Sequence, residues 1–172
     1  MVAPTILDLG CGSNKYPNSY GVDFQQLPGV DMVWDLNEFL PGDHWGKYSV
    51  VHTKCVLDHI GNPLNFLRGC YQYLQNDGKL ILIIDNGNYW RYHVHLGNYH
   101  AHVWENDAPG VPWAHHKMMF QKEHLVKLLG LIGFKNITAR YFRDYRGFLK
   151  GHVDYLFPKH LGRNMIRIEA QK

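Results

Sequence analysis

Glycine and aspartate residues near the N-terminus follow three successive apolar runs. Gly10 and Gly12 come directly after residues 6–9, and Asp23 and Asp35 end the next two runs. Glycines let the main chain bend tightly and approach a ligand without a side-chain collision. One carboxylate can accept a hydrogen bond from each hydroxyl of a ribose diol. The other can accept a hydrogen bond from the amino group of adenine. Because parallel strands present their carboxyl ends to one crevice, we expect these residues to form a single site.

The elements that must position these residues are predicted from short apolar segments. Runs rich in β-branched and aromatic residues, bounded by Gly, Pro, Asn or Asp, predict strands. The continuously apolar run at residues 79–84 predicts a strand that is buried on both faces of a parallel sheet. Two alternating segments near the C-terminus predict an antiparallel edge hairpin. The predicted strands are residues 5–9, 20–24, 32–34, 48–52, 79–84, 136–142 and 164–170.

Two helices are predicted between these strands. Asn62 can cap the first helix, and Pro63 occupies its first helical position. Leucine and tyrosine residues then recur at helical spacing as far as an Asp-Gly turn. The second helix covers residues 121–132 and ends before a glycine. Strands that alternate with helices predict an α/β fold, and we expect residues 1–172 to form a single domain.

The composition is that of one globular domain in a reducing compartment. The chain has 172 residues, of which 45% are hydrophobic, and a net charge of +3, which leaves nucleic acid open as a partner without requiring it. The odd number and irregular spacing of Cys11, Cys55 and Cys70 argue against a disulfide framework. We interpret Cys11 and Cys55 as small buried residues near the pocket. With no apolar run long enough for a bilayer and no secretory signal, we expect a cytoplasmic protein without a membrane partner.

Four segments, in order along the chain, resemble motifs of class I S-adenosylmethionine-dependent methyltransferases. Residues 6–12 (ILDLGCG) resemble the first motif of the family, and residues 56–60 (VLDHI) resemble its Leu-Glu-His segment. Residues 74–80 (LQNDGKL) are similar to its Leu-x-Pro-Gly-Gly turn, and residues 128–134 (LLGLIGF) to its helix ending in Gly-Phe. The resemblance implies a three-layer Rossmann-like fold with a mostly parallel seven-stranded sheet and an antiparallel edge hairpin. It also implies S-adenosylmethionine as the cofactor.

The resemblance also implies a role for individual residues. Asp23 would bind the ribose of the methyl donor, and Asp35 with Leu36 would hold the adenine. Thr53 and Lys54 would line the site near the sulfonium. A nicotinamide-binding turn would need a third glycine, which this turn lacks. The residues expected to face the methionine half of the donor are Asp8, Gly10, Cys11 and Gly12.

The chain departs from the family pattern after the glycine turn. Only ten residues separate Gly12 from Asp23, and Pro17 interrupts them, so the segment supplies one helical turn at most. We therefore expect a shortened first helix. We also expect the sheet face beside it to be unusually exposed, or covered by a second copy of the chain or by a partner subunit.

Residues 86–117 form an insertion where this family builds its acceptor-binding loop or hairpin. One interpretation is a surface hairpin with solvated histidines. A second is an acceptor lid in which a neutral side chain removes a proton from a hydroxyl or amine. A third is a zinc or nickel site. The catalytic candidates are His93, His116 and Tyr89, and the metal candidates are His93, His95, His100 and His102.

Several functions fit these sequence features. The favoured one is methyl transfer to an oxygen or nitrogen of a small molecule. The alternatives are a non-catalytic nucleotide-binding or scaffold subunit with the same fold, and a metal-binding protein centred on the histidines. We expect His59, in the segment after the fourth predicted strand, to support its loop rather than perform chemistry.

Overall fold

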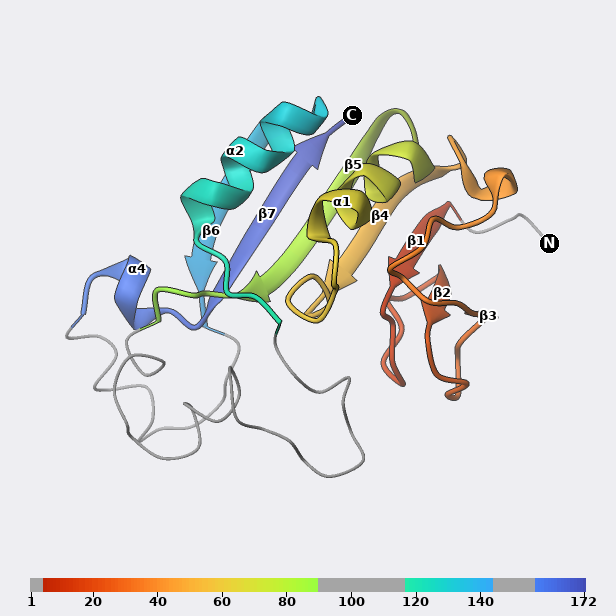
Figure 1. Ribbon diagram of the computed structural model, residues 1–172, viewed down its shortest axis with the longest axis horizontal. Coiled ribbons are helices and arrows are strands. Elements are labelled where there is room, and N and C mark those ends of the chain that lie inside the picture. Colours follow the sequence, from red (N-terminus) through yellow and green to blue (C-terminus); the bar gives the residue numbers. More distant parts are fainter. Residues whose placement is uncertain (1–4, 90–116, 144–156) are drawn as a thin grey trace.

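A seven-stranded mixed sheet forms the centre of the molecule (Figure 1). The computed structural model describes residues 5–89, 117–143 and 157–172. Within these residues the strand order is β3-β2-β1-β4-β5-β7-β6. Strands β1 to β5 pair in parallel, and β7 is antiparallel to both β5 and β6. The predicted α/β fold with an antiparallel edge pair is therefore confirmed. The strands are β1 (Ile6–Leu9), β2 (Ser19–Asp23), β3 (Met32–Val33), β4 (Tyr48–Lys54), β5 (Leu74–Asp85), β6 (Lys135–Phe142) and β7 (Met165–Gln171).

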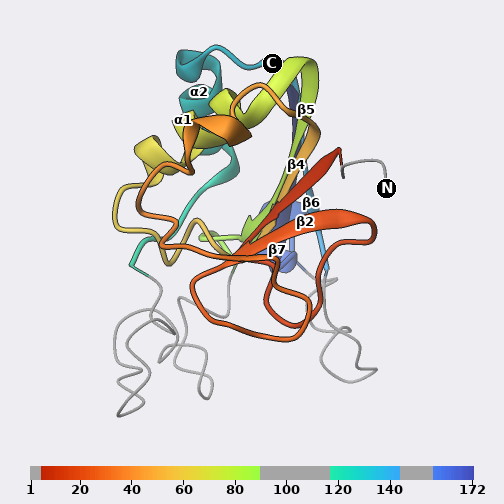
Figure 2. The same cartoon turned by 90° about the vertical axis from the view of Figure 1, so that its right-hand side faces the viewer.

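Helices α1 (Pro63–Tyr73) and α2 (Lys122–Ile132) lie on the same face of the sheet (Figure 2). The predicted cap is present, because the side chain of Asn62 accepts the Asn65 N–H at 3.0 Å. Strand β5 begins immediately after α1, earlier than expected, because its first residue pairs with the start of β4 beside a bulge. No helix in the described ranges has both the length and the apolarity needed to cross a membrane.

Two short helical elements were not predicted from the sequence. They are the 3-10 helix η1 (Gly42–His44) and the helix α4 (Lys159–Gly162). Each has only a few residues and follows a proline, which fixes the entry of the chain. A repeating apolar pattern needs more turns than these elements have, so their sequences carry no helical periodicity.

The main core lies between the sheet and the two long helices. Side chains alternate along each strand, so only every second residue faces α1 and α2. A smaller cluster on the opposite face contains Ile81, Ile83 and Met165. Strand β5 is thus buried on both faces, as its apolar run predicts. The strand residues of the main core include Leu7, Leu9, Val51, Leu80, Leu82, Ile84, Ile166 and Ile168, and the helix residues include Leu67, Leu125 and Leu129.

A loop without a helix connects β1 to β2. Residues 10–18 contain turns and irregular backbone but no helix, which confirms the shortened first helix. The Tyr16 ring packs on the His52 ring with centroids 4.5 Å apart. Beneath the loop, Asp8 and His52 are only 3% and 8% exposed. The expectation of an unusually exposed face is therefore wrong at this position, because the loop of the chain itself covers it.

A buried histidine–tyrosine pair links η1 to the start of β4. Nδ1 of His44 lies 2.7 Å from the hydroxyl oxygen of Tyr48, and both side chains are buried. Burial raises the pKa of the Tyr48 phenol, so the hydroxyl keeps its proton and can donate it. Burial also lowers the pKa of His44 below its ordinary value of 6.5, although Asp43 opposes this shift. The pair therefore favours a neutral imidazole that accepts the hydrogen bond.

We expect acid to weaken the fold through His44. The unfolded chain takes up a proton near pH 6.5, but the folded chain does so only at lower pH. The stabilisation is therefore present above about pH 6.5 and is lost as the pH falls below it. Between about pH 7.5 and about pH 5.5, the wild-type protein should lose more unfolding free energy than His44→Gln, as measured by urea unfolding. His124→Gln, on the exposed side of α2, should keep the wild-type pH slope, and equal slopes for the wild type and His44→Gln would contradict this account.

Candidate functional site

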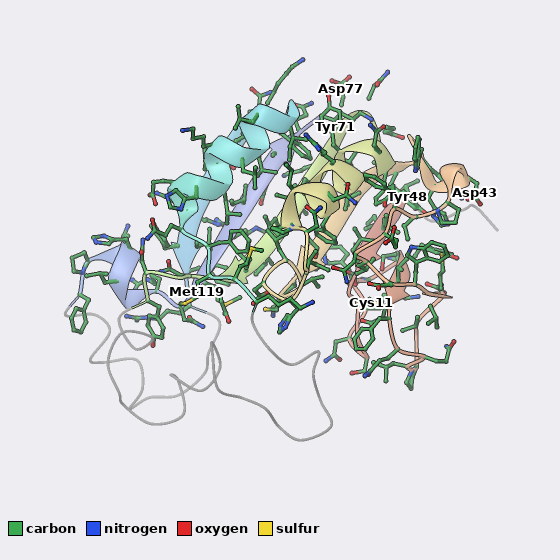
Figure 3. All side chains as sticks on the ribbon, viewed as in Figure 1. Cys11, Asp43, Tyr48, Tyr71, Asp77 and Met119 are labelled. Atoms are coloured by element: carbon green, nitrogen blue, oxygen red, sulfur yellow. The ribbon has the colours of Figure 1, made fainter. Side chains whose placement is uncertain are left out.

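A cleft of about 900 Å³ opens at the carboxyl ends of the parallel strands. Its lining includes Gly10 after β1, Asp23 at the end of β2, Asp35 and Leu36 after β3, and Val56 after β4. Cys11, in the turn after β1, lies at this end of the sheet, and Asp77 lies at the opposite end (Figure 3). The remaining described lining residues are Phe24, Val33, Trp34, Asn37, Cys55, His59, Ile60 and Lys117.

The glycine turn packs closely against the loop that follows β4. Gly10 and Gly12 adopt left-handed conformations, with φ of +69° and +53°. The Gly10 N–H donates to the Val22 carbonyl at 2.8 Å. A Cβ on Gly10 would lie 2.1 Å from Val56 Cγ2, whereas a Cβ on Gly12 would meet no heavy atom within 4 Å. Gly10 is therefore required for packing, and Gly12 leaves open space beside the main chain.

Asp23 is held in place by main-chain donors. Its Oδ2 accepts the Gly12 N–H at 2.9 Å, and its Oδ1 accepts the Gln25 N–H at 3.1 Å. Each carboxylate oxygen has a second acceptor position, so the pair can still receive two hydroxyl donors. The acid predicted to bind ribose and the glycine turn are thus one hydrogen-bonded unit.

Asp35 is exposed and connects two of the loops around the cleft. Its Oδ1 accepts both the main-chain N–H and the side-chain amide of Asn37, at 2.9 and 2.8 Å. The Asn37 Oδ1 in turn accepts the Gly61 N–H at 2.8 Å. Because these bonds use one carboxylate oxygen, the described contacts leave the other for an amino-group donor.

Apolar side chains form part of the cleft wall beside the two acids. Phe24 and Val33 are 47% and 45% exposed, which is high for large apolar residues. A flat ring that covers them removes apolar surface from water. The indole Nε1 of Trp34, another lining residue, has no hydrogen-bond partner among the described residues. An apolar surface with a few fixed polar groups is typical of a cofactor pocket.

Asp8 does not line this cleft. Because side chains alternate along β1, Asp8 points to the face opposite Leu7 and Leu9, where His52 is its register partner. Its Oδ1 lies 2.7 Å from His52 Nδ1, and its Oδ2 accepts the Tyr16 N–H at 2.7 Å. Asp8 therefore holds the loop that follows the glycine turn, and its contact with the methionine half of the donor stays a prediction.

The two cysteines near the site have different environments. Cys11 is buried, and burial, reinforced by the charges of Asp8 and Asp23, raises the pKa of its thiol to about 11. A thiol with such a pKa stays protonated near neutral pH and is a poor nucleophile. Cys55 was expected to be buried, but it is exposed and lines the cleft. It follows the last residue of β4, so it has left the sheet that would cover it.

The remaining candidate residues lie outside the cleft lining or outside the described part of the chain. Thr53 is fully buried, Lys54 is exposed at the end of β4, and neither lines the cleft. Tyr89 is also buried outside the cleft lining, with its N–H bonded to the Asn86 carbonyl. Within the described ranges, no group of three or more potential metal ligands occurs. The candidates that lie outside those ranges are His93, His95, His100, His102 and His116.

Two basic residues on the cleft wall were not predicted as ligand contacts. His59 lies in the loop after β4, with its Nε2 3.9 Å from Oδ2 of the buried Asp58. Lys117 approaches from a distant part of the sequence, and its N–H donates to the Asp58 carbonyl at 2.7 Å. The sequence marks His59 through the segment at residues 56–60, but no local pattern marks Lys117. Three further lining residues could have been predicted because they lie close in sequence to the predicted acids: Phe24, Val33 and Trp34.

Comparisons with known proteins agree with this geometry. The sequence matches a family model described as a methyltransferase domain over residues 2–139. It matches none of the curated proteins. A similar solved structure is an S-adenosylmethionine-dependent methyltransferase from Archaeoglobus fulgidus, with 17% identity and a TM-score of 0.70, covering 97% of this chain and 85% of that one.

Two further solved structures are similar to this chain. One is a Haloferax volcanii protein in complex with the Trm112 methyltransferase activator, at 12% identity and a TM-score of 0.65, covering 98% of this chain and 82% of that one. The other is Haemonchus contortus phosphoethanolamine N-methyltransferase 2 in complex with S-adenosyl-L-methionine, at 15% identity and a TM-score of 0.64. It covers 97% of this chain and 48% of that one. At these identities, the likeness shows a shared fold.

We expect alanine to be tolerated less well at Gly10 than at Gly12. Both substitutions place a Cβ on left-handed backbone, at a cost of about 1 to 2 kcal/mol. Only Gly10→Ala also collides with Val56, so it should lower the free energy of unfolding by about 1 to 3 kcal/mol more than Gly12→Ala. Urea unfolding of both variants measures the difference. Val56→Ala in the Gly10→Ala background should recover part of the loss, and equal losses for the two glycines would be inconsistent with this packing.

Proposed function

Because this chain belongs to the methyltransferase-domain family, we propose that it transfers a methyl group from S-adenosylmethionine to an oxygen or nitrogen of a small molecule. The observation that best supports this proposal is the presence of Asp23 and Asp35 in one cleft with exposed apolar residues. One carboxylate suits the ribose diol and the other suits the exocyclic amine of adenine. A cleft for an unrelated ligand would not need both acids at successive strand ends.

The residues around the cleft fit an adenosyl group with an attached methionine chain. Phe24 and Val33 supply apolar surface for the adenine ring. Asp23 keeps acceptor positions for the ribose while holding the glycine turn. The open space beside Gly12 lets the main chain approach the methionine half of the donor. We therefore assign donor binding to Gly10, Asp23, Asp35 and Leu36, which line the cleft, and to Gly12, which is hydrogen-bonded to Asp23 beside it.

The proposed chemistry depends chiefly on alignment. S-adenosylmethionine supplies a methyl group bound to a positively charged sulfur, which an acceptor lone pair can approach in line. Holding the reacting atoms close and correctly oriented accounts for much of the acceleration in such reactions. Residues 86–117 are proposed to receive the acceptor, and His93 and His116 are the candidates for removing its proton.

A protein that acts only with a partner subunit is the second candidate. One similar fold, from Haloferax volcanii, is in complex with a methyltransferase activator. Light scattering after size exclusion distinguishes a monomer from a homodimer, and a methylation assay on the pure chain tests whether a partner is needed. Activity in a pure monomer would remove this candidate.

The donor class can be tested by thermal unfolding with a panel of ligands. S-adenosylmethionine and S-adenosylhomocysteine should both raise the melting temperature, because each binds only the folded cleft. NAD and ATP serve as matched nucleotide controls and should have a smaller effect. Stabilisation by NAD or ATP without stabilisation by the first two ligands would contradict the proposed donor. Transfer of a labelled methyl group to small hydroxyl and amine compounds then identifies the acceptor class.

We expect Asp23→Ala to weaken donor binding by at least about tenfold, because it removes charged acceptors for the ribose and the anchor of Gly12. Calorimetric titration with S-adenosylhomocysteine measures this affinity. Asp43→Ala is the control, because Asp43 is exposed in η1 and does not line the cleft. It should bind like the wild type. An unchanged affinity in Asp23→Ala would reject the proposed ribose site.

A further inference from the structure

We propose that His52 is a positioning residue for the methyl donor, acting through Asp8 on the loop that carries Gly12. This inference rests on the proposed function and assigns a role to a buried pair outside the donor cleft. Neither His52 nor Asp8 lines that cleft. Their effect would be transmitted by the main chain of residues 10–18.

The Asp8–His52 pair is a buried and well-formed contact. The residues face each other across the paired strands β1 and β4, and the atoms Oδ1 and Nδ1 are 2.7 Å apart. The pair is covered by Tyr16, whose ring packs on the His52 ring. The second oxygen of Asp8 accepts the Tyr16 N–H at 2.7 Å. Asp8 thus joins a fixed strand residue to a loop residue.

Carboxylates hold the loop on both sides of residues 13–15. On one side, the Gly12 N–H donates to Asp23, and on the other, the Tyr16 N–H donates to Asp8. Residues 10–18 contain no helix whose own hydrogen bonds could order them. Lys15 adds a contact with Asp31, but that pair is exposed and contributes little. Gly10 and Cys11 are also held, by N–H bonds to the Val22 carbonyl, so from Gly12 to Tyr16 the side-chain anchors are the carboxylates of Asp23 and Asp8.

His52 matters because a buried carboxylate needs more than one donor. Removing the imidazole would leave Oδ1 of Asp8 unpaired in a buried place, which is costly for a charged group. Asp8 would then reorient toward water, and its hydrogen bond to Tyr16 would weaken. The loop would lose one of its two carboxylate anchors, and Gly12 would no longer be held in the conformation suited to the donor.

The test compares His52→Leu with His52→Asn, since the asparagine side-chain amide can take the place of Nδ1 as a donor to Asp8. Asp8→Asn is a second route to the same contact, and Tyr16→Phe is the matched control that keeps the ring and the main-chain N–H. Three measurements are made on each protein. They are hydrogen exchange of the Tyr16 amide, the calorimetric affinity for S-adenosylhomocysteine, and the midpoint of urea unfolding.

In His52→Leu we expect exchange at the Tyr16 amide to accelerate and donor affinity to fall by about tenfold. In His52→Asn both should return to within about threefold of the wild type, even where the unfolding midpoint stays lowered. A general loss of stability would lower the midpoint without this selective recovery. Tyr16→Phe should match the wild type in amide exchange and donor affinity.

Unchanged donor affinity in His52→Leu, or in Asp8→Asn if the leucine variant does not fold, would overturn the inference. Loss of donor affinity without faster exchange at Tyr16 would also overturn it, because the loop would not be the link. If the wild-type protein binds neither S-adenosylmethionine nor S-adenosylhomocysteine, the proposed function fails. In that case, faster Tyr16 exchange in His52→Leu would still establish that His52 anchors the loop.

Discussion

The hydrogen bonds between carboxylates and the main chain of residues 10–18 are the interaction on which the site depends. A helix after the glycine turn would order this segment through its own backbone bonds, but here the turn is followed by an irregular loop. Asp23 holds Gly12 from inside the cleft, and Asp8 holds Tyr16 from the other face of the sheet. Two strand-borne acids thus replace the local order that a helix would give, and each acid is itself fixed by a strand of the central sheet.

The sheet makes this arrangement possible because its centre is rigid. Strand β5 is buried on both faces. Strand β4 pairs with β5, and β1 pairs with the other edge of β4. Buried strands with close packing on either side leave little freedom for the residues at their ends. The chemistry can then be placed on short loops, since each loop begins at a fixed point. The architecture explains how a cleft can form without a helix over the glycine turn.

The fold and the two acids of the cleft could be predicted because their signals are local. A strand end followed by Gly10, Asp23 or Asp35 is readable in a few residues, and strand direction alone brings such ends together. The pairing of Asp8 with His52 could not be predicted, because it depends on which side of β1 meets α1 and α2, and the motif does not state this. Lys117 was missed for a different reason, since only the folded chain brings it to Asp58.

One main-chain contact in the cleft has a thermodynamic consequence. The carbonyl of Asp58 accepts the main-chain N–H of Lys117, and Lys117 lines the cleft. Lys117 is also the last residue of the segment proposed to receive the acceptor. If that segment receives the acceptor as proposed, an acceptor seated there and a ligand in the cleft would share Lys117, and the two binding events would be energetically linked. By thermodynamic linkage, if donor binding changes the affinity for the acceptor by some factor, acceptor binding changes the affinity for the donor by the same factor.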